Sequence, residues 1–200
     1  ELAKGKKKEI LELFTKYNQI RTQEEYNDIA TSLQHACQEG DVELIRILLG
    51  EQIEYKSLIF KIDKTNKTAS LIKNASYLCE LTVPRVITHE NDDYLVTSIL
   101  SFYISYRSYE RIPKLKVKFE ENSAVKTIYG NAFLFTDICE IYFPESLTEL
   151  KKGWCSFTRN LTNIVIPPSN DRFIFKDDKY LLGKTNPSSD EFDVLFFVRK

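Results

Sequence analysis

The sequence has no methionine, only 2 histidines and 4 cysteines, and no more than 6 glycines in 200 residues. It contains no Gly-rich phosphate loop, no nucleophile elbow, no paired His-Glu motif and no Cys-x-x-Cys pair. The sequence therefore lacks the residue patterns that nucleotide binding, hydrolysis and zinc binding require. We predict a chain that is not an enzyme and that requires no cofactor and no metal ion.

Charge and hydropathy argue against two further classes of partner. The formal net charge of −1, with a sequence pI near 6.3, gives no reason to expect a nucleic-acid binder. The most apolar run, residues 94–106, is shorter than the roughly eighteen residues that span a bilayer, so we predict no membrane span in this chain. The lysines at residues 4–8 could contact phosphates, but a solvated helix start explains them better. The amphipathic helix pattern that follows is not a secretory signal. Because the chain lacks Met and opens in this helical pattern, we expect it to be part of a longer protein.

The main pattern is a strand-like phrase, apolar-x-apolar and usually closed by proline, that recurs along the chain. Its four copies are Leu81-Thr82-Val83-Pro84, Leu115-Lys116-Val117-Lys118-Phe119, Ile141-Tyr142-Phe143-Pro144 and Ile164-Val165-Ile166-Pro167. The spacing is 26 residues (115 to 141) and then 23 (141 to 164). A second signature lies between the copies, at residues 125–128 before Phe133 and at residues 147–150 before Cys155. Near-constant spacing of this length predicts a solenoid, in which each repeat buries its apolar face against the next.

The residues of these phrases resemble a known repeat family. Val-Lys-Thr-Ile-Tyr-Gly-Asn-Ala-Phe at residues 125–133, followed by the 141–144 and 147–150 segments, is similar to the BspA-like leucine-rich repeat. Two hairpin patterns at residues 58–72 and 86–96 resemble the lead-in that such repeats have in parasitic protists of the trichomonad type. The resemblance covers about residues 57–200. It implies a solenoid fold and a protein-binding role, and it brings no catalytic residues.

An N-terminal stretch resembles a different repeat. Residues 31–49 (TSLQHACQEGDVELIRILL) are similar to an ankyrin repeat, with Ser32 in place of the usual proline and Gln34 in place of the usual histidine. Gly40 is expected to end the first helix of the pair, and residues 42–49 form the second. Residues 6–17 also follow helical spacing, and they match the second helix of a preceding repeat. About three repeats are needed to bury such faces, so we expect further repeats upstream.

The predicted fold class is therefore α+β, with N-terminal ankyrin-like helical hairpins followed by a β-rich leucine-rich-repeat solenoid. We place the partial ankyrin segment at residues 1–53 and the repeat domain at residues 57–200. Residues 100–113, which are rich in aromatics, are interpreted as a degenerate repeat. A hairpin insertion is predicted at about residues 171–200, with strands at 173–175, 180–182 and 194–198, and the last strand would leave an open edge.

The four cysteines are expected to be free. Cys79 and Cys139 precede equivalent strands two rungs apart, roughly 10 Å at about 4.8 Å per rung, and a disulfide requires Cα atoms within about 7 Å. Cys155 takes the position of Phe133 in the next repeat, and Cys37 lies on the apolar side of a helix. We predict buried free thiols that act as small hydrophobes.

Two other groups of residues have both a functional and a structural interpretation. The Asp pairs at 92–93 and 177–178 are cation ligands in one interpretation and turn residues in the other, and turn chemistry explains paired Asp better. Three glycosylation sequons begin at Asn66, Asn74 and Asn160. In a chain rich in Asn, Ser and Thr, three sequons give little support for a secreted protein.

Strand alternation predicts a working surface. The core-facing residues of the four phrases are Leu81, Val83, Leu115, Val117, Ile141, Phe143, Ile164 and Ile166. The residues expected on the opposite, exposed face, and hence the candidate partner-binding residues, are Glu80, Thr82, Lys116, Lys118, Glu140, Tyr142, Asn163 and Val165. The alternative is that these are ordinary solvated strand residues.

Two functions are consistent with this sequence. The first is a non-catalytic protein-protein interaction or scaffold module with a protein partner, and the second is a structural cell-surface antigen or adhesin. Unpaired cysteines, ankyrin-type helices and the absence of a secretory signal favour the cytoplasm. The sequons and the surface-antigen reputation of the BspA-like family favour the cell surface.

Overall fold

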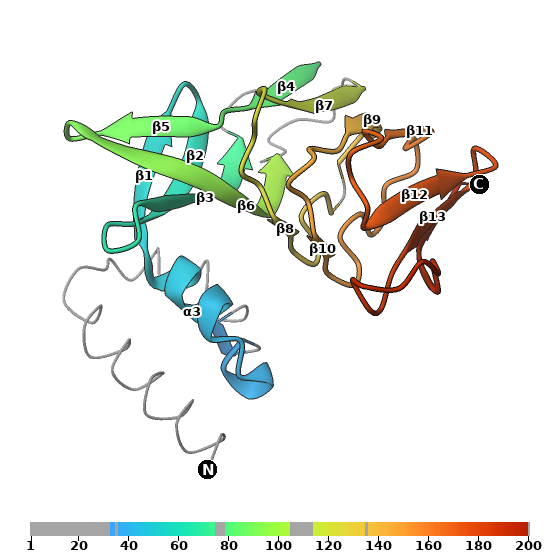
Figure 1. The fold of residues 1–200 in the computed structure, drawn as a ribbon. Coiled ribbons are helices and arrows are strands. Elements are labelled where there is room, and N and C mark those ends of the chain that lie inside the picture. The colour runs from blue at the N-terminus through green and yellow to red at the C-terminus, as the bar shows by residue number, and fades with distance from the viewer. Residues whose placement is uncertain (1–32, 35, 75–78, 105–113, 135, 200) are drawn as a thin grey trace, which may run out of the picture.

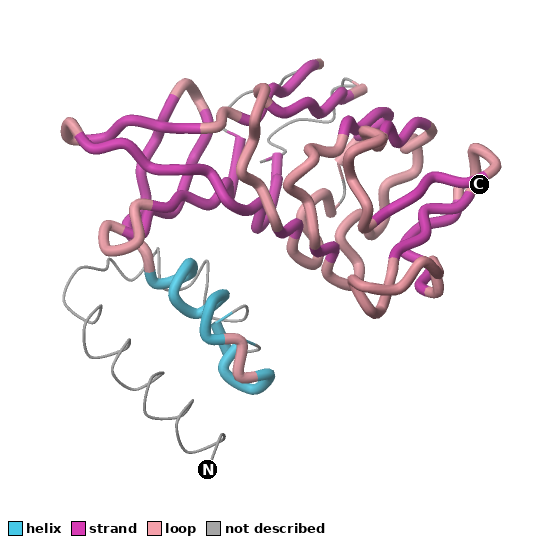
Figure 2. Tube along the Cα trace, in the orientation of Figure 1, coloured by secondary structure: helices cyan, strands magenta, loops and turns pink. Residues whose placement is uncertain are grey.

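The computed structural model describes residues 33–34, 36–74, 79–104, 114–134 and 136–199 (Figure 1). Helix is confined to the N-terminal part of this region, and strands and loops make up the rest (Figure 2). Within the described residues, helical stretches at residues 33–34 and 36–39 and helix α3 (Val42–Leu49) are followed by fourteen strands in three sheets. The helix predicted at residues 6–17 lies outside the described residues.

The two helical segments pack against each other and against the first sheet. Gly40 has a φ of 65° and separates them, as predicted, and the Asp41 side chain caps α3 by accepting a hydrogen bond from the Leu44 N–H at 3.0 Å. Their small core consists of Leu33, Ala36, Ile45, Leu48 and Leu49, and Leu100 from the sheet packs against it. At Gly50 a Cβ atom would lie 2.7 Å from the Ile62 carbonyl oxygen, so only glycine permits this close approach.

The first sheet has seven strands. They are β1 (Glu51–Tyr55), β2 (Leu58–Asp63), β3 (Thr68–Asn74), β5 (Val86–His89), β6 (Asp92–Ile104), β8 (Thr127–Ile128) and β10 (Glu149–Leu150). The β2–β3 and β5–β6 pairs are antiparallel hairpins, which confirms the two predicted hairpins. The β3–β6, β6–β8 and β8–β10 pairs are parallel. Strands β8 and β10, which belong to the second repeat signature, therefore extend the sheet beyond β6.

The prediction for this sheet was wrong in two places. Strand β1 was not predicted, because the β1–β2 turn is made by Lys56 and Ser57, both with positive φ, and not by the Gly or Asn typical of such turns. Residues 100–104 were interpreted as part of a degenerate repeat, but they continue β6, in register with β3 up to Asn74–Ile104. The remainder of that segment, residues 105–113, lies outside the described residues.

The second sheet consists of the four predicted phrases. Its strands are β4 (Glu80–Val83), β7 (Leu115–Phe119), β9 (Ile138–Tyr142) and β11 (Asn163–Val165), and every pairing is parallel. The sheet order β11-β9-β7-β4 follows the chain order, so each phrase lies beside the next, as the spacing predicts. The register shifts between Leu115 and Lys116, and Ile138 and Ile141 are both buried although they are three residues apart.

The third sheet is formed by the three strands predicted near the C-terminus, in the segment that we interpreted as a hairpin insertion. It is an antiparallel meander of β12 (Phe173–Lys176), β13 (Tyr180–Gly183) and β14 (Val194–Val198), drawn in red in Figure 1. Edge-to-face aromatic contacts connect it to the repeats. They are Phe133–Trp154 at 6.1 Å, Phe143–Trp154 at 5.7 Å, Phe143–Phe173 at 6.2 Å and Phe173–Phe196 at 5.4 Å between ring centroids.

All four cysteines are free, as predicted. Their expected burial is only partly confirmed, because Cys79 is exposed while Cys37, Cys139 and Cys155 are half-buried. Cys79 lies just before β4, the last of the described strands in its sheet, so none of these strands covers it from the outer side. Desolvation raises the pKa of the Cys155 thiol to about 11.

Candidate functional site

The exposed face of the second sheet brings all eight predicted partner-binding residues together in two cross-strand rows. We call the first the polar row. It consists of Glu80, Lys116, Glu140 and Asn163, which are register partners in consecutive strands. We call the second the tyrosine row. It consists of Thr82, Lys118, Tyr142 and Val165.

The opposite face of the same strands is almost completely buried, which confirms the predicted alternation for all but one residue. The buried residues are Leu81, Val83, Leu115, Val117, Ile141, Phe143 and Ile164. Ile166 was predicted to share this core but is only half-buried. It follows β11, which is an edge strand among the described residues, so a strand of this sheet covers it from one side only.

The predicted exposure of the two rows is correct for five residues and too high for three. Glu80, Thr82, Lys116, Asn163 and Val165 are exposed, whereas Lys118, Glu140 and Tyr142 are half-buried. The Glu140 side chain retains only 13% of its surface. These three side chains cover one another, which alternation along a single strand does not reveal.

Glu140 is the centre of the polar row. Its Oε2 atom lies 3.0 Å from Lys116 Nζ, and its Oε1 atom accepts hydrogen bonds from the Tyr142 hydroxyl at 2.9 Å and from Asn163 Nδ2 at 2.6 Å. The bond from Lys116, followed by those from Tyr142 and Asn163, lowers the pKa of the Glu140 carboxyl. The contact with Glu140 raises the pKa of Lys116, and the separate hydrogen bond from the Tyr142 hydroxyl to Glu140 raises the pKa of Tyr142. A carboxylate with three donors holds the neighbouring side chains in fixed positions.

Lys118 joins the two rows. Its ammonium group lies 3.1 Å from Glu80 Oε1 and 5.7 Å from the centroid of the Tyr142 ring. Tyr142 is thus fixed at its hydroxyl by Glu140 and over its ring by Lys118. An ordered aromatic ring next to the exposed Val165 is a surface on which another protein can pack.

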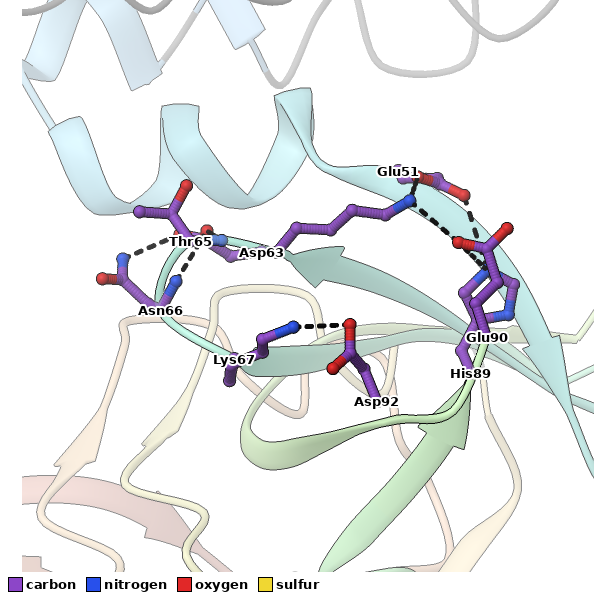
Figure 3. Close-up of polar contacts among 9 residues, drawn as sticks. Glu51, Asp63, Thr65, Asn66, Lys67, His89, Glu90 and Asp92 are labelled. Atoms are coloured by element: carbon purple, nitrogen blue, oxygen red, sulfur yellow. Dashed lines mark hydrogen bonds and ion pairs between the residues drawn. The ribbon is translucent and has the colours of Figure 1, made fainter.

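A second polar cluster, which no sequence pattern predicted, lies at the tips of the hairpins (Figure 3). Lys64 Nζ lies 2.9 Å from Glu51 Oε2 and 3.2 Å from Glu90 Oε2, and these two carboxylates raise the pKa of Lys64. His89 Nε2 lies 3.6 Å from Glu51 Oε1, and Lys67 pairs with Asp92 at 2.6 Å. These contacts join β1 to the β2–β3 and β5–β6 turns, so they stabilise the arrangement of the hairpins.

The alternative candidates have structural roles. Asp177 and Asp178 both have positive φ in the β12–β13 turn, which supports the turn interpretation of that pair. In the other pair, Asp92 binds Lys67, and Asp93 accepts a hydrogen bond from the Thr88 hydroxyl at 2.7 Å. Within the described residues no group of three or more His, Cys, Asp or Glu side chains is arranged to hold a metal ion.

Two of the three sequons have a described acceptor side chain. Asn66 is exposed at the β2–β3 turn, and its Nδ2 donates to Asp63 Oδ2 at 2.8 Å. Asn160 is exposed ahead of β11, and its Nδ2 donates to Asp137 Oδ1. The side chain of Asn74 lies outside the described set.

Comparison with known proteins gives few matches. No family model matches the chain, and no curated protein sequence matches it. Among solved structures, it is similar to the pneumococcal vaccine antigen PcpA, with 17% identity and a TM-score of 0.44. It is also similar to a leucine-rich cell surface protein from Faecalibacterium prausnitzii (19% identity, TM-score 0.34) and to a leucine-rich repeat protein from Bacteroides ovatus (14% identity, TM-score 0.28).

These likenesses are partial. They cover 61%, 61% and 57% of this chain and 39%, 44% and 41% of the respective proteins. The chain therefore spans less than half of each of these three proteins. At such TM-scores they support no argument about family or function.

Across the described part of the chain, none of the helices combines the length and the apolar content needed to cross a bilayer.

Proposed function

We propose that this chain is a non-catalytic protein-interaction or scaffold module of the BspA-like leucine-rich-repeat type, preceded by a partial ankyrin repeat. It binds a protein partner through the face that carries the polar row and the tyrosine row. The observation that carries this proposal is Tyr142, held between Glu140 and Lys118 beside the exposed Val165.

The energetics of binding favour a surface of this kind. A side chain that is already ordered loses little conformational entropy when a partner packs on it, whereas a mobile side chain costs about 0.5–1.5 kcal/mol. Tyr is also among the residues enriched in binding hot spots. The polar side chains at the centre of this face already hydrogen-bond to one another, so a partner that covers them has few polar groups to satisfy.

The experiment compares binding by matched surface variants. The tagged chain captures partners from the cells that produce it, and the same capture is made with Tyr142→Ala/Val165→Ala and with Phe157→Ala. Phe157 is 70% exposed and lies outside the four-stranded sheet, so it controls for non-specific loss of apolar surface. Partners of the face should be depleted at least about tenfold by the double variant, which corresponds to about 1.4 kcal/mol, and retained by Phe157→Ala.

The folding of each variant is checked by urea unfolding. Surface substitutions usually change stability by less than about 0.5 kcal/mol. If the correctly folded double variant captures the same partners as the wild type, the proposed face is not the binding site.

The second candidate is a structural cell-surface antigen or adhesin. The exposed Asn66 and Asn160 of two sequons favour it, whereas four free thiols favour the reducing cytoplasm, which we retain as the first choice. Mass spectrometry of the protein from its own cells distinguishes the two. Glycan on either asparagine establishes passage through the secretory pathway, and unmodified asparagines with free thiols support the cytoplasmic interaction module.

A further inference from the structure

One inner strand of the proposed binding face carries a column of lysines. Lys114, Lys116 and Lys118 alternate with the buried Leu115 and Val117, so all three lysines lie on the exposed face. Alternate residues of a strand are about 6.6 Å apart. Strand β7 lies between β4 and β9, so this lysine column runs along the interior of the sheet and not along its edge.

The lysines keep hydrogen-bonding capacity that the face itself does not use. A Lys ammonium group has three N–H donors. Lys116 contacts Glu140 at 3.0 Å, and Lys118 contacts Glu80 at 3.1 Å. The Lys116 side chain retains 51% of its surface, and the Lys118 side chain retains 40%. Both ammonium groups therefore have donors left for an acceptor on a partner.

The neighbouring carboxylates are less available to a partner. Glu140 already accepts from three donors, and its side chain retains only 13% of its surface. Asp137, which precedes β9, is half-buried and accepts a hydrogen bond from Asn160 Nδ2. The more exposed Glu80 lies on β4, on the opposite side of the lysine column from β9 and β11. A partner that covers β7, β9 and β11 thus meets lysine donors, shielded carboxylates and an apolar area.

We propose that the partner of this face is an acidic peptide segment, bound in an extended conformation along the lysine column. Carboxylates on its alternate residues accept hydrogen bonds from Lys114, Lys116 and Lys118, because an extended segment has the same spacing of about 6.6 Å. An apolar side chain of the segment packs on Tyr142 and Val165, which lie on the next two strands. This inference rests on the proposed function and adds the chemistry of the partner to it.

Electrostatic complementarity selects an acidic segment over other peptides. A basic segment would place like charges against the lysine column, and the carboxylates that it needs are already paired. An uncharged segment would cover the ammonium groups without neutralising them, which costs free energy. Attraction between exposed charges is screened by salt, so binding should weaken as the ionic strength rises.

The test begins with selection of peptides from a phage-displayed dodecapeptide library on the immobilised 200-residue chain at low salt. The selected peptides should be enriched in Asp and Glu at alternate positions, next to Leu, Ile or Phe. A fluorescently labelled synthetic peptide of the most enriched sequence is then titrated with the protein by fluorescence anisotropy. Its dissociation constant should rise at least about fivefold between about 50 mM and about 300 mM salt.

Charge-matched variants test the lysine column. Lys116→Gln with Lys118→Gln keeps a side-chain donor at each position and removes two positive charges, so it should raise the dissociation constant at least about fivefold. Lys152→Gln with Lys176→Gln removes the same charge from exposed residues outside the four-stranded sheet, and it should change the constant less than about twofold. Urea unfolding confirms that each variant is folded.

Two results would overturn the acidic partner and leave the proposed face intact. Both involve peptides that lose binding in Tyr142→Ala/Val165→Ala and therefore use this face. In the first, these peptides carry no excess of acidic residues. In the second, they bind Lys116→Gln/Lys118→Gln as tightly as the wild type.

Three further results would also overturn the inference. Acidic peptides that bind Tyr142→Ala/Val165→Ala as tightly as the wild type use another surface. Equal loss in both lysine pairs shows attraction to the overall charge and not to the column. If the wild type selects no peptide, or binds heparin and no acidic peptide, the face does not recognise an acidic segment, and the capture experiment still decides whether it binds a protein.

Discussion

The Tyr142 hydroxyl donates a 2.9 Å hydrogen bond to Glu140 Oε1, two residues back along β9 on the same face of the sheet. The same oxygen accepts a hydrogen bond from Asn163 on the next strand, and the other oxygen contacts Lys116 on the preceding one. One carboxylate thus connects three adjacent strands on the face that we propose to bind partners.

This arrangement makes the face sensitive to acid. Its donors lower the pKa of Glu140 below the ordinary value of 4.5, so the contribution of Glu140 to stability is fully present above pH 4.5 and is lost as pH falls through the folded-state pKa. Glu140→Gln should therefore reduce the free energy of unfolding at neutral pH, and the difference from the wild type should shrink by about pH 3. Urea unfolding at both pH values measures it.

The control for this experiment is Glu121→Gln, because Glu121 is an exposed turn residue. Its substitution should change the unfolding free energy by less than about 0.5 kcal/mol at either pH. Equal effects of the two substitutions at neutral pH would contradict the central role of Glu140.

Asn170 holds the start of the C-terminal insertion against the repeat before it. Its side chain is 7% exposed, and Nδ2 donates to the carbonyl oxygens of Pro144, Glu145 and Leu147, while Oδ1 accepts from the N–H groups of Arg172 and Phe173. Asn170→Ala removes the hydrogen bonds of the buried Leu147 carbonyl and Phe173 N–H, at about 1–3 kcal/mol each before relaxation. We expect a loss of roughly 2–4 kcal/mol in urea unfolding.

Asn186 provides the comparison. Its side chain is exposed, and its Oδ1 accepts a hydrogen bond from the Ser188 N–H at 3.0 Å. Asn186→Ala should cost less than about 1 kcal/mol. A similar small cost for Asn170→Ala would show that the Asn170 contacts do not hold the insertion in place.

Local periodicity accounts for the parts of the fold that were predictable. Alternation fixes which side of each phrase is buried, and near-constant spacing places the phrases side by side, so the two rows followed from the sequence. The polar turn of the β2–β3 hairpin was also predictable, because Asp side chains favour turns. In the structure, Asp63 accepts hydrogen bonds from the Thr65 and Asn66 N–H groups.

The remaining features depend on contacts between distant residues. The half-burial of Glu140 comes from Lys116, Tyr142 and Asn163, and the spacing of the strands does not predict that all three side chains turn toward one carboxylate. The register shift at Leu115–Lys116 places Ile138 and Ile141 on the same side, against simple alternation. Strand β1 was not predicted, because Lys56 and Ser57, which form the β1–β2 turn, are not the Gly or Asn typical of such turns.

The four thiols should react at different rates. Thiol titration of the denatured protein without reductant should find all four cysteines free. In the folded protein, the exposed Cys79 should react first with a thiol reagent at neutral pH. Cys155 should react far more slowly than Cys79, because desolvation raises its pKa to about 11 and leaves little thiolate. Stopped-flow labelling with peptide mapping measures both rates, and a Cys79–Cys139 bridge would contradict the stacking of the strands.

Trp154 is 1% exposed, and its Nε1–H is a buried donor without a hydrogen-bond partner among the described residues. Its ring packs edge-to-face against Phe133 and Phe143, so Trp154→Ala removes a large part of the core and should cost about 3–5 kcal/mol. Trp154→Phe keeps an aromatic ring and removes the unpaired donor, whose burial costs about 1–3 kcal/mol. In Trp154→Phe, loss of the unpaired donor should stabilise the protein, whereas the cavity left by the smaller ring should destabilise it.

We therefore expect Trp154→Phe to cost less than half as much as Trp154→Ala in urea unfolding. Phe133→Leu is the control, since it reduces a neighbouring buried ring without changing any polar atom. If Trp154→Phe is as destabilising as Trp154→Ala, removing the unpaired donor gives no compensation and the prediction is wrong.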